Sequence, residues 1–238
     1  MKDSKKYGPK VRRVYRTLKR KYPKIEPVLY DEPTEAVVCA LISEKMSESA
    51  TRSAVKKFHE HFVDLNDLRV SRAEEIVELL GEDTPEAKDA ALSLTRALMA
   101  IFEKYNKVSL EGLKRIGKRP AKQILEKLNG VTHFVVNYCM LTALQGHAIP
   151  LTTKMYEYLR EKELVHPEAD NQEIEGFLTR LIPADSAYEF YYLFRHESEK
   201  KRRKRSKKTE TAAKPETKTA TGTRKKTRKI KTRTRSKK

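Results

Sequence analysis

Residues 128–154 read LNGVTHFVVNYCMLTALQGHAIPLTTK, and this stretch decides the fold more than any other part of the chain. The dipeptide Asn129-Gly130 predicts a tight turn, because glycine adopts backbone conformations that other residues avoid. The apolar run over 135–144 predicts a helix directly after the turn. A short loop that contains Pro150 then leads into a further helix. The stretch therefore predicts a helical hairpin followed by a loop and another helix.

Helical periodicity continues over most of the chain up to about Glu199, and no segment alternates with the period of a strand. We therefore predict an all-α body of roughly ten helices. Asp170 and Asp185 are expected to cap helices, by the local patterns DNQE and ADSA. The expected helices cover residues 11–18, 33–41, 54–62, 73–80, 85–102, 109–115, 120–128, 135–144, 153–162, 171–181 and 184–196.

The hairpin and its loop resemble the signature of the helix-hairpin-helix DNA glycosylases, the endonuclease III superfamily. In that family the hairpin typically reads LPGVGxKTA and the loop PVDTH, whereas this chain has LNGVTHFVV and PLTTK. The segment PTEAVVCALISEKMSESATRSAVKKF over 33–58 is similar to the family's early helix, typically PFELLVATILSQQTTD. The segment LTRLIPADSAYEFYYLFRHESE over 178–199 resembles the family's late helix. The resemblance covers about residues 25–199 and implies two helical lobes around a cleft, with the hairpin beside it.

The two groups that carry the family's chemistry are replaced in this chain. Phe134 stands at the position of the catalytic lysine, whose amine attacks the sugar and forms a Schiff base. Thr152 stands at the position of the aspartate that stabilises the oxocarbenium-like sugar and helps to activate water. Neither side chain supplies the missing nucleophile or charge, so we predict that the usual chemistry is absent. Lys154 and His133 are the substitutes to test.

The resemblance also concerns cofactors, because the family's late helix leads into four cysteines that hold an iron–sulfur cluster. Here the only cysteines are Cys39 and Cys139, both in apolar helical runs. We expect no iron–sulfur cluster, and two buried free thiols that suit a reducing compartment. His59 and His61 lack a third ligand at suitable spacing, so no metal site is expected either.

The hairpin is the first candidate for contact with DNA. A turn followed by a helix N-terminus offers backbone N–H groups and a positive dipole end to one phosphate. Thr132 replaces the family's second glycine, which permits a close approach of the backbone. Lys45 aligns with the residue that the family inserts into the DNA stack, and it is expected to reach phosphate instead. The expected hairpin contacts are Asn129, Gly130, Val131 and Thr132.

The net charge of +19 is distributed very unevenly along the 238 residues. Residues 200–238 carry 20 Lys and Arg against two Glu, and residues 1–24 carry 11 against one Asp. The remaining residues 25–199 are acidic overall, by about nine charges. Basic ends on an acidic body predict a polyanion as partner.

We divide the chain into a basic N-terminal helix over 1–24, the glycosylase-like helical domain over 25–199 and a basic tail over 200–238. The tail lacks the apolar residues needed to offset its ordering entropy, so it is expected to be disordered. The charged DNA contacts expected outside the domain are Arg12, Arg13, Arg16, Lys200, Lys201, Arg202, Arg203, Lys204 and Arg205.

Three interpretations of function remain open at this point. The first is a DNA-binding protein on the glycosylase scaffold that lacks the usual chemistry. The second is an active glycosylase or abasic-site lyase with relocated catalytic groups, and the third is an RNA- or ribosome-associated protein. No apolar run reaches the length of a membrane span, and the N-terminus shows no secretory signal. We expect an intracellular protein, located at the nucleoid of a bacterium or in the nucleus of a eukaryote.

Overall fold

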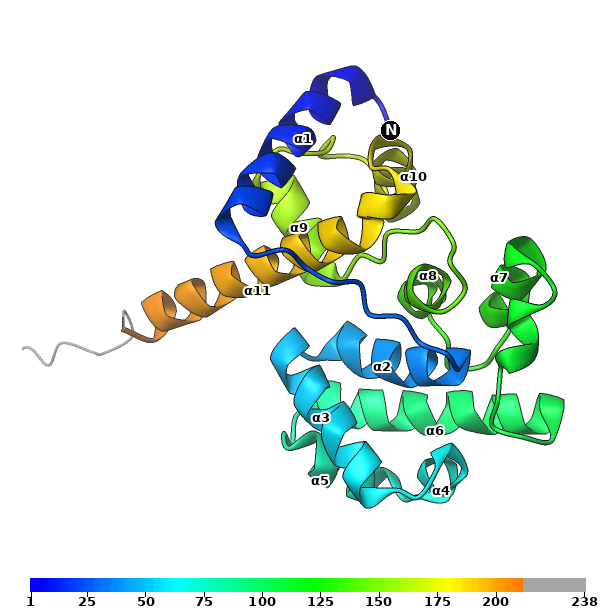
Figure 1. Cartoon of the computed structure of the whole chain (residues 1–238). Helices are drawn as coiled ribbons and strands as arrows, with labels where there is room; N and C mark the ends of the chain where they lie inside the picture. The colour runs from blue at the N-terminus through cyan, green and yellow to red at the C-terminus, as the bar shows by residue number, and fades with distance from the viewer. Residues whose placement is uncertain (212–238) are drawn as a thin grey trace, which may run out of the picture.

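The computed structural model describes the backbone of residues 1–211 and the side chains of residues 1–200. Helices make up all the regular structure in this part of the chain, which confirms the predicted all-α class (Figure 1). None of these helices is both long and apolar enough to cross a bilayer. In chain order the elements are α1 (Ser4–Lys21), α2 (Pro33–Lys45), α3 (Glu48–His61), α4 (Leu65–Val70), α5 (Ala73–Leu80), α6 (Pro85–Tyr105), η1 (Glu111–Lys114), α7 (Lys118–Glu126), α8 (His133–Thr142), α9 (Thr153–Glu161), α10 (Asn171–Leu181), η2 (Ala184–Ser186) and α11 (Ala187–Thr211).

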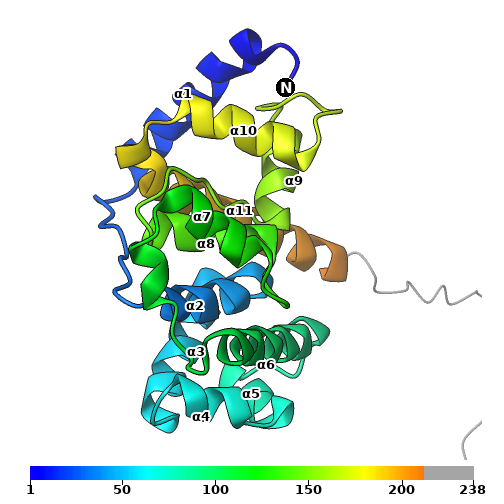
Figure 2. The same cartoon turned by 90° about the vertical axis from the view of Figure 1, so that its right-hand side faces the viewer.

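The helices form two lobes, as expected (Figures 1 and 2). The first lobe contains α2 to α6, and the second lobe contains α1, α9, α10 and α11. Helices α7 and α8 lie between them, and α8 packs on α2 as well as on α11. The hairpin thus lies at the junction of the two lobes.

Helix α2 is the centre of the molecule and packs on α3, α6 and α8. Its sequence PTEAVVCALISEK is apolar on every side, which is typical of a fully buried helix. Glu32 caps its start by accepting hydrogen bonds from the Thr34 backbone (3.2 Å) and the Leu110 backbone (2.8 Å). The same carboxylate accepts from the hydroxyl of Ser109 (3.0 Å), so it joins α2 to η1.

One face of helix α1 packs against α11. The buried side chains of this face belong to the same hydrophobic core as those of the other described helices. Val11 and Tyr15 are buried one turn apart, as the periodicity of this segment requires. The hydroxyl of Tyr15 donates to Glu189 of α11 (2.5 Å), and Lys19 pairs with the same carboxylate (2.6 Å). Polar contacts therefore fix the orientation of a helix that apolar contacts hold in place.

The guanidinium of Arg195 is buried between α11 and the C-terminal end of α2, with 1% of the residue exposed. Its Nη2 donates to the carbonyls of Ser43 (2.7 Å) and Met46 (3.0 Å), which end α2. Its Nη1 donates to the hydroxyls of Ser43 and Tyr191, and its Nε to Glu199 (3.0 Å). Arg195 therefore fixes α11 to the corner between α2 and α3.

Two predicted helix caps and one short helix show how far the local sequence signal reaches. Asp170 caps α10, because its Oδ1 accepts from the Glu173 backbone (2.7 Å), and this confirms the prediction. Asp185 was expected to cap as well, and this is wrong: it lies inside η2, whose cap position belongs to Pro183. The short helix α4, capped by Asp64, was missed because six residues carry too little periodic signal.

Helix α11 extends beyond the expected end of the domain at Glu199 and continues to Thr211. Lys and Arg are good helix formers and favour a helix in this segment. The loss of apolar residues after Glu199 indicates an end of the helical part, so this extension was not predicted. The expected disorder of residues 212–238 lies outside the described residues.

Replacement of Arg195 by Met tests how much the buried guanidinium contributes to stability. We expect the free energy of unfolding to fall by about 3–5 kcal/mol, because buried carbonyls and carboxylates lose their partner. Urea denaturation followed by circular dichroism measures this difference. Arg52→Met is the control: its side chain is 72% exposed beside Glu48 and should contribute less than about 1 kcal/mol. Equal losses for the two variants would contradict the assignment.

Candidate nucleic-acid interface

The predicted hairpin is present, with α7 and α8 joined by a tight turn. Gly130 adopts φ = 82°, a left-handed conformation that favours glycine. A Cβ at this position would lie 3.0 Å from the carbonyl oxygen of Ser93 and 3.1 Å from the backbone nitrogen of Ala97, both in α6. Asn129 beside it is exposed. The turn therefore requires glycine for its backbone conformation and for its close approach to α6.

The N-terminus of α8 can bind an anion. Thr132 is its N-cap, and its hydroxyl accepts from the backbone N–H of Val135 (3.3 Å). Among the described residues no acceptor pairs with the backbone N–H groups of Thr132, His133 or Phe134. Such N–H groups at the positive end of a helix dipole are a general means of holding a phosphate. The half-buried Val131 lies next to them in the turn.

A carboxylate lies beside this helix N-terminus. The hydroxyl of Thr132 donates to Oε2 of Glu44 (3.0 Å), at the C-terminal end of α2. Burial raises the pKa of Glu44 above its usual value, although the bond from Thr132 opposes this shift. Lys45 pairs with Asp89 (2.7 Å), and that hydrogen bond raises its pKa. The expected phosphate contact of Lys45 must therefore compete with an acidic partner.

Phe134 and Thr152 both have structural roles in the places where the resemblance puts catalytic groups. The ring of Phe134 is buried against Tyr138 and Tyr191, with centroids 6.1 and 6.4 Å away. Thr152 is buried at the start of α9, where its hydroxyl accepts from the backbone N–H of Met155 (3.4 Å). Phe134 therefore contributes to the core, and Thr152 caps a helix.

The two suggested substitutes, His133 and Lys154, lie in different depressions of the surface. The imidazole of His133 contacts Glu175 of α10 (2.5 Å), which raises the pKa of His133. The same carboxylate accepts from Asn137 (3.1 Å) and from the hydroxyl of Tyr156. This network directs His133 toward α10, so the structure does not bring the two substitutes together.

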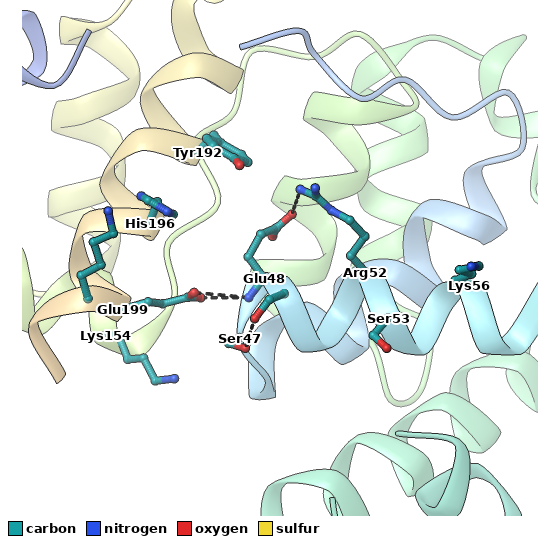
Figure 3. A pocket seen from close by; sticks show the side chains of 11 residues that line it. Ser47, Glu48, Arg52, Ser53, Lys56, Lys154, Tyr192, His196 and Glu199 are labelled. Carbon is teal, nitrogen blue, oxygen red and sulfur yellow. Dashed lines mark hydrogen bonds and ion pairs between the residues drawn. The ribbon is translucent and has the colours of Figure 1, made fainter. Parts of the chain in front are cut away.

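Lys154 contributes to a pocket of about 760 Å³ between the two lobes (Figure 3). The side chain of Glu48 projects into the pocket and pairs with Arg52 (3.5 Å). Its backbone N–H donates to Glu199 of α11 (3.2 Å). The lining residues come from the corner between α2 and α3, the start of α9, and α11: Ser47, Glu48, Ser49, Arg52, Ser53, Lys56, Lys154, Tyr192, His196, Glu199 and Lys200.

His196 lines this pocket from α11. Burial and the nearby Lys200 lower its pKa, and its Nδ1 is buried without a hydrogen-bond partner. Its ring stacks on Tyr192 at 6.3 Å and 8°. This pocket was not predicted from the sequence, although Tyr192, His196 and Glu199 have the spacing that places side chains on one helix face. The residues at the corner between α2 and α3 show no comparable spacing in the sequence.

Cys39 and Cys139 are buried free thiols, which confirms that expectation. Burial raises the pKa of both thiols, so they are poor nucleophiles and poor ligands. In the part of the chain that the structure describes, no three His, Cys, Asp or Glu side chains converge as metal ligands.

A basic segment that leads into the hairpin was not predicted as a binding surface either. Residues 107–127 contain seven Lys and Arg against two Glu. Three of these cations have carboxylate partners, whereas Lys118, Arg119 and Lys127 are exposed and form no ion pair with any described residue. The signal was present in the sequence KRIGKRPAKQILEKLNG, but the much larger charge of the two chain ends obscured it.

The other predicted cations lie away from the hairpin. Arg12, Arg13 and Arg16 are exposed on α1, on the far side of the second lobe. Lys200 is exposed at the rim of the pocket, 3.2 Å from the hydroxyl of Tyr22. Residues 201–205 belong to α11, and the structure describes their backbone but not their side chains.

Neither the family models nor the curated protein sequences contain a match to this chain. Solved structures do match. A trapped endonuclease III–DNA covalent intermediate superposes with a TM-score of 0.61 at 15% identity, over 79% of this chain and 84% of that chain. The Clostridium acetobutylicum 8-oxoguanine glycosylase/lyase in complex with double-stranded DNA gives 0.62 at 18% identity, over 84% and 71%. The H. pylori 3-methyladenine DNA glycosylase MagIII gives 0.59 at 14% identity, over 84% and 98%.

These likenesses establish the fold. The described chain is an all-α protein whose two lobes meet at a helical hairpin. It has the fold of the helix-hairpin-helix DNA glycosylase superfamily, which confirms the resemblance seen in the sequence.

Replacement of Gly130 by Ala tests the hairpin turn. We expect a loss of about 1–3 kcal/mol in the free energy of unfolding, because alanine is strained at this φ and its Cβ meets the α6 backbone. Thermal and urea denaturation measure the change. Gly112→Ala is the matched control, since a Cβ there meets nothing within 4 Å. An unchanged stability for Gly130→Ala would contradict the close packing of the turn on α6.

Proposed function

We propose that this chain binds duplex DNA through backbone phosphates and does so without the usual glycosylase or lyase chemistry. The observation that carries the proposal is the N-terminus of α8, where consecutive backbone N–H groups have no partner among the described residues. Lys118, Arg119 and Lys127, which form no ion pair with a described residue, lie on the same hairpin and add positive charge. Phosphate contacts of this kind position a protein on DNA but carry no sequence information.

The structural neighbours support DNA as the polyanion. The matching endonuclease III structures are DNA complexes, and the matching Clostridium enzyme is bound to double-stranded DNA. A DNA-binding role further suggests the nucleoid or the nucleus as the location. Structured RNA is the competing polyanion, since charge alone does not separate the two.

Phe134 supports the absence of lyase chemistry, because its side chain has no amine. The site is also apolar and lies against two tyrosine rings, so its burial would disfavour a charged amine. The pocket carries a second candidate function, an active enzyme with relocated groups. Lys154, Glu48 and His196 line one depression there, which offers an amine, a carboxylate and a neutral imidazole together (Figure 3).

A salt titration of duplex binding tests the proposed function. We expect affinity to fall by about 10³–10⁵ between 50 and 200 mM salt if roughly 6–10 phosphates are contacted. The triple variant Lys118→Ala, Arg119→Ala, Lys127→Ala should reduce the slope of log K against log salt by about 2–3. Fluorescence anisotropy with a labelled duplex measures both quantities.

The matched control for this titration replaces Lys114, Arg115 and Lys122 with Ala, since these cations already pair with carboxylates. The control should change the slope less. Absence of duplex binding at low salt would overturn the proposal. A preference for structured RNA over duplex DNA at matched salt would replace DNA by RNA as the partner.

Borohydride trapping on abasic-site DNA separates the two candidate functions. We expect no covalent adduct, because Phe134 supplies no amine. An adduct that disappears in the Lys154→Ala variant would establish a relocated lyase. Incubation with damaged duplexes covers the glycosylase version, and release of a base would contradict the proposal.

Glu44→Gln tests the carboxylate beside the phosphate site. The glutamine oxygen still accepts from Thr132, while the negative charge that repels phosphate is lost, so duplex affinity should rise about 3- to 10-fold. In the wild type, affinity should also rise as the pH falls through the raised pKa of Glu44, and the variant should lack this component. Glu60→Gln, on an exposed part of α3, is the control. Unchanged affinity for Glu44→Gln would mean that phosphate does not approach this end of α8.

A further inference from the structure

Helix α1 has two faces that differ in how their cations are used. On the inner face, Lys19 pairs with Glu189 (2.6 Å) and Lys21 with Glu197 (3.2 Å), both on α11. Lys10 lies 3.9 Å from a carboxylate oxygen of the loop after α9. These lysines hold α1 to the lobe, and their charge is largely neutralised.

The outer face of α1 carries arginines instead. Arg12, Arg13, Arg16 and Arg20 are exposed, and none of them pairs with a carboxylate of the described residues. Eight residues of α-helix place the first and last of them about 12 Å apart. Guanidinium groups suit phosphate particularly well, because their planar fork donates two parallel hydrogen bonds. No large apolar side chain is exposed on α1, so this face lacks the apolar centre of a protein interface.

The arginine face and the hairpin lie on different sides of the molecule. In Figure 1, α1 and α7 flank the second lobe, with α9 and α10 between them. In Figure 2, α10 again lies between α1 and α7. Duplex DNA is stiff over about 50 nm, so a short straight duplex on the hairpin does not reach the outer face of α1.

We propose that the outer face of α1 binds the phosphate backbone of a second duplex, so that one chain bridges two DNA segments. This rests on the proposed function, because the first duplex occupies the hairpin. Four unpaired guanidiniums are a surface for a polyanion of any sequence. The chain would then hold DNA segments together in addition to binding one of them.

A bridging assay with the full chain tests this inference. One biotinylated duplex is fixed on beads, and capture of a second, fluorescent duplex is measured as a function of protein and salt. The wild type should capture the second duplex. The variant Arg12→Ala, Arg13→Ala, Arg16→Ala should reduce capture at least about tenfold and lower its salt slope by up to about 3, since each contacted phosphate contributes about 0.9. Its affinity for a single duplex should change less than about threefold.

Two variants serve as controls. Arg12→Lys, Arg13→Lys, Arg16→Lys keeps the charge and should retain most of the bridging. Arg72→Ala, Lys104→Ala removes two other exposed cations, away from α1 and outside the basic segment that leads into the hairpin, and should also bridge normally. Circular dichroism confirms that each variant is folded.

The outcomes separate this inference from the proposed function. Undiminished capture by the alanine variant of α1 would overturn the inference and assign bridging to another part of the chain. An equal loss of single-duplex affinity would also overturn it, since α1 would then contact the same duplex as the hairpin. If the wild type binds single duplexes but captures no second one, the inference fails and the proposed function stands. If no duplex binds at low salt, the proposed function fails.

Discussion

The buried guanidinium of Arg195 is the interaction on which the arrangement of the lobes depends. It donates to the carbonyls of Ser43 and Met46, which would otherwise end α2 without partners in a dry interior. Because Arg195 belongs to α11, these bonds give the corner between α2 and α3 one fixed position relative to the last helix, while its Nε also donates to Glu199 within α11. The pocket between the lobes is lined by this corner and by α11, whose relative position these bonds fix. A charge with every donor satisfied is well suited to that purpose, since its geometry is directional.

The hairpin owes its backbone geometry to two residues, Gly130 and Thr132. Gly130 keeps the turn against α6, and Thr132 caps α8 so that the helix N-terminus remains open to an anion. Phe134 fills an apolar site between rings, where its burial contributes to the core. Glu44 places a partly buried carboxylate next to the open N-terminus, and its negative charge opposes the binding of phosphate that we propose there.

Much of the fold could be predicted because helix signals are local. The apolar periodicity, the Asn129-Gly130 turn and the Asp170 cap each depend on residues within one or two turns, and the structure confirms all three. The prediction of short elements failed for the same reason, because a few residues carry little local signal. Residues 184–186 form a 3-10 helix, so Asp185 lies inside it and Pro183 takes the cap position. The assignment of Phe134 and Thr152 to the family's catalytic positions rests on the spacing of a motif and stays a prediction.

By itself the sequence determined the helices, the hairpin turn and the residue types at positions 134 and 152, because these follow from the order of residues along the chain. Only the tertiary structure decided which cations remain without a partner. Lys19 and Arg16 are equally basic in the sequence, yet one pairs with Glu189 of α11 and the other meets no carboxylate among the described residues. The pocket around Glu48 was likewise a tertiary result. Pairing and enclosure depend on contacts between residues more than a hundred positions apart, which no local pattern encodes.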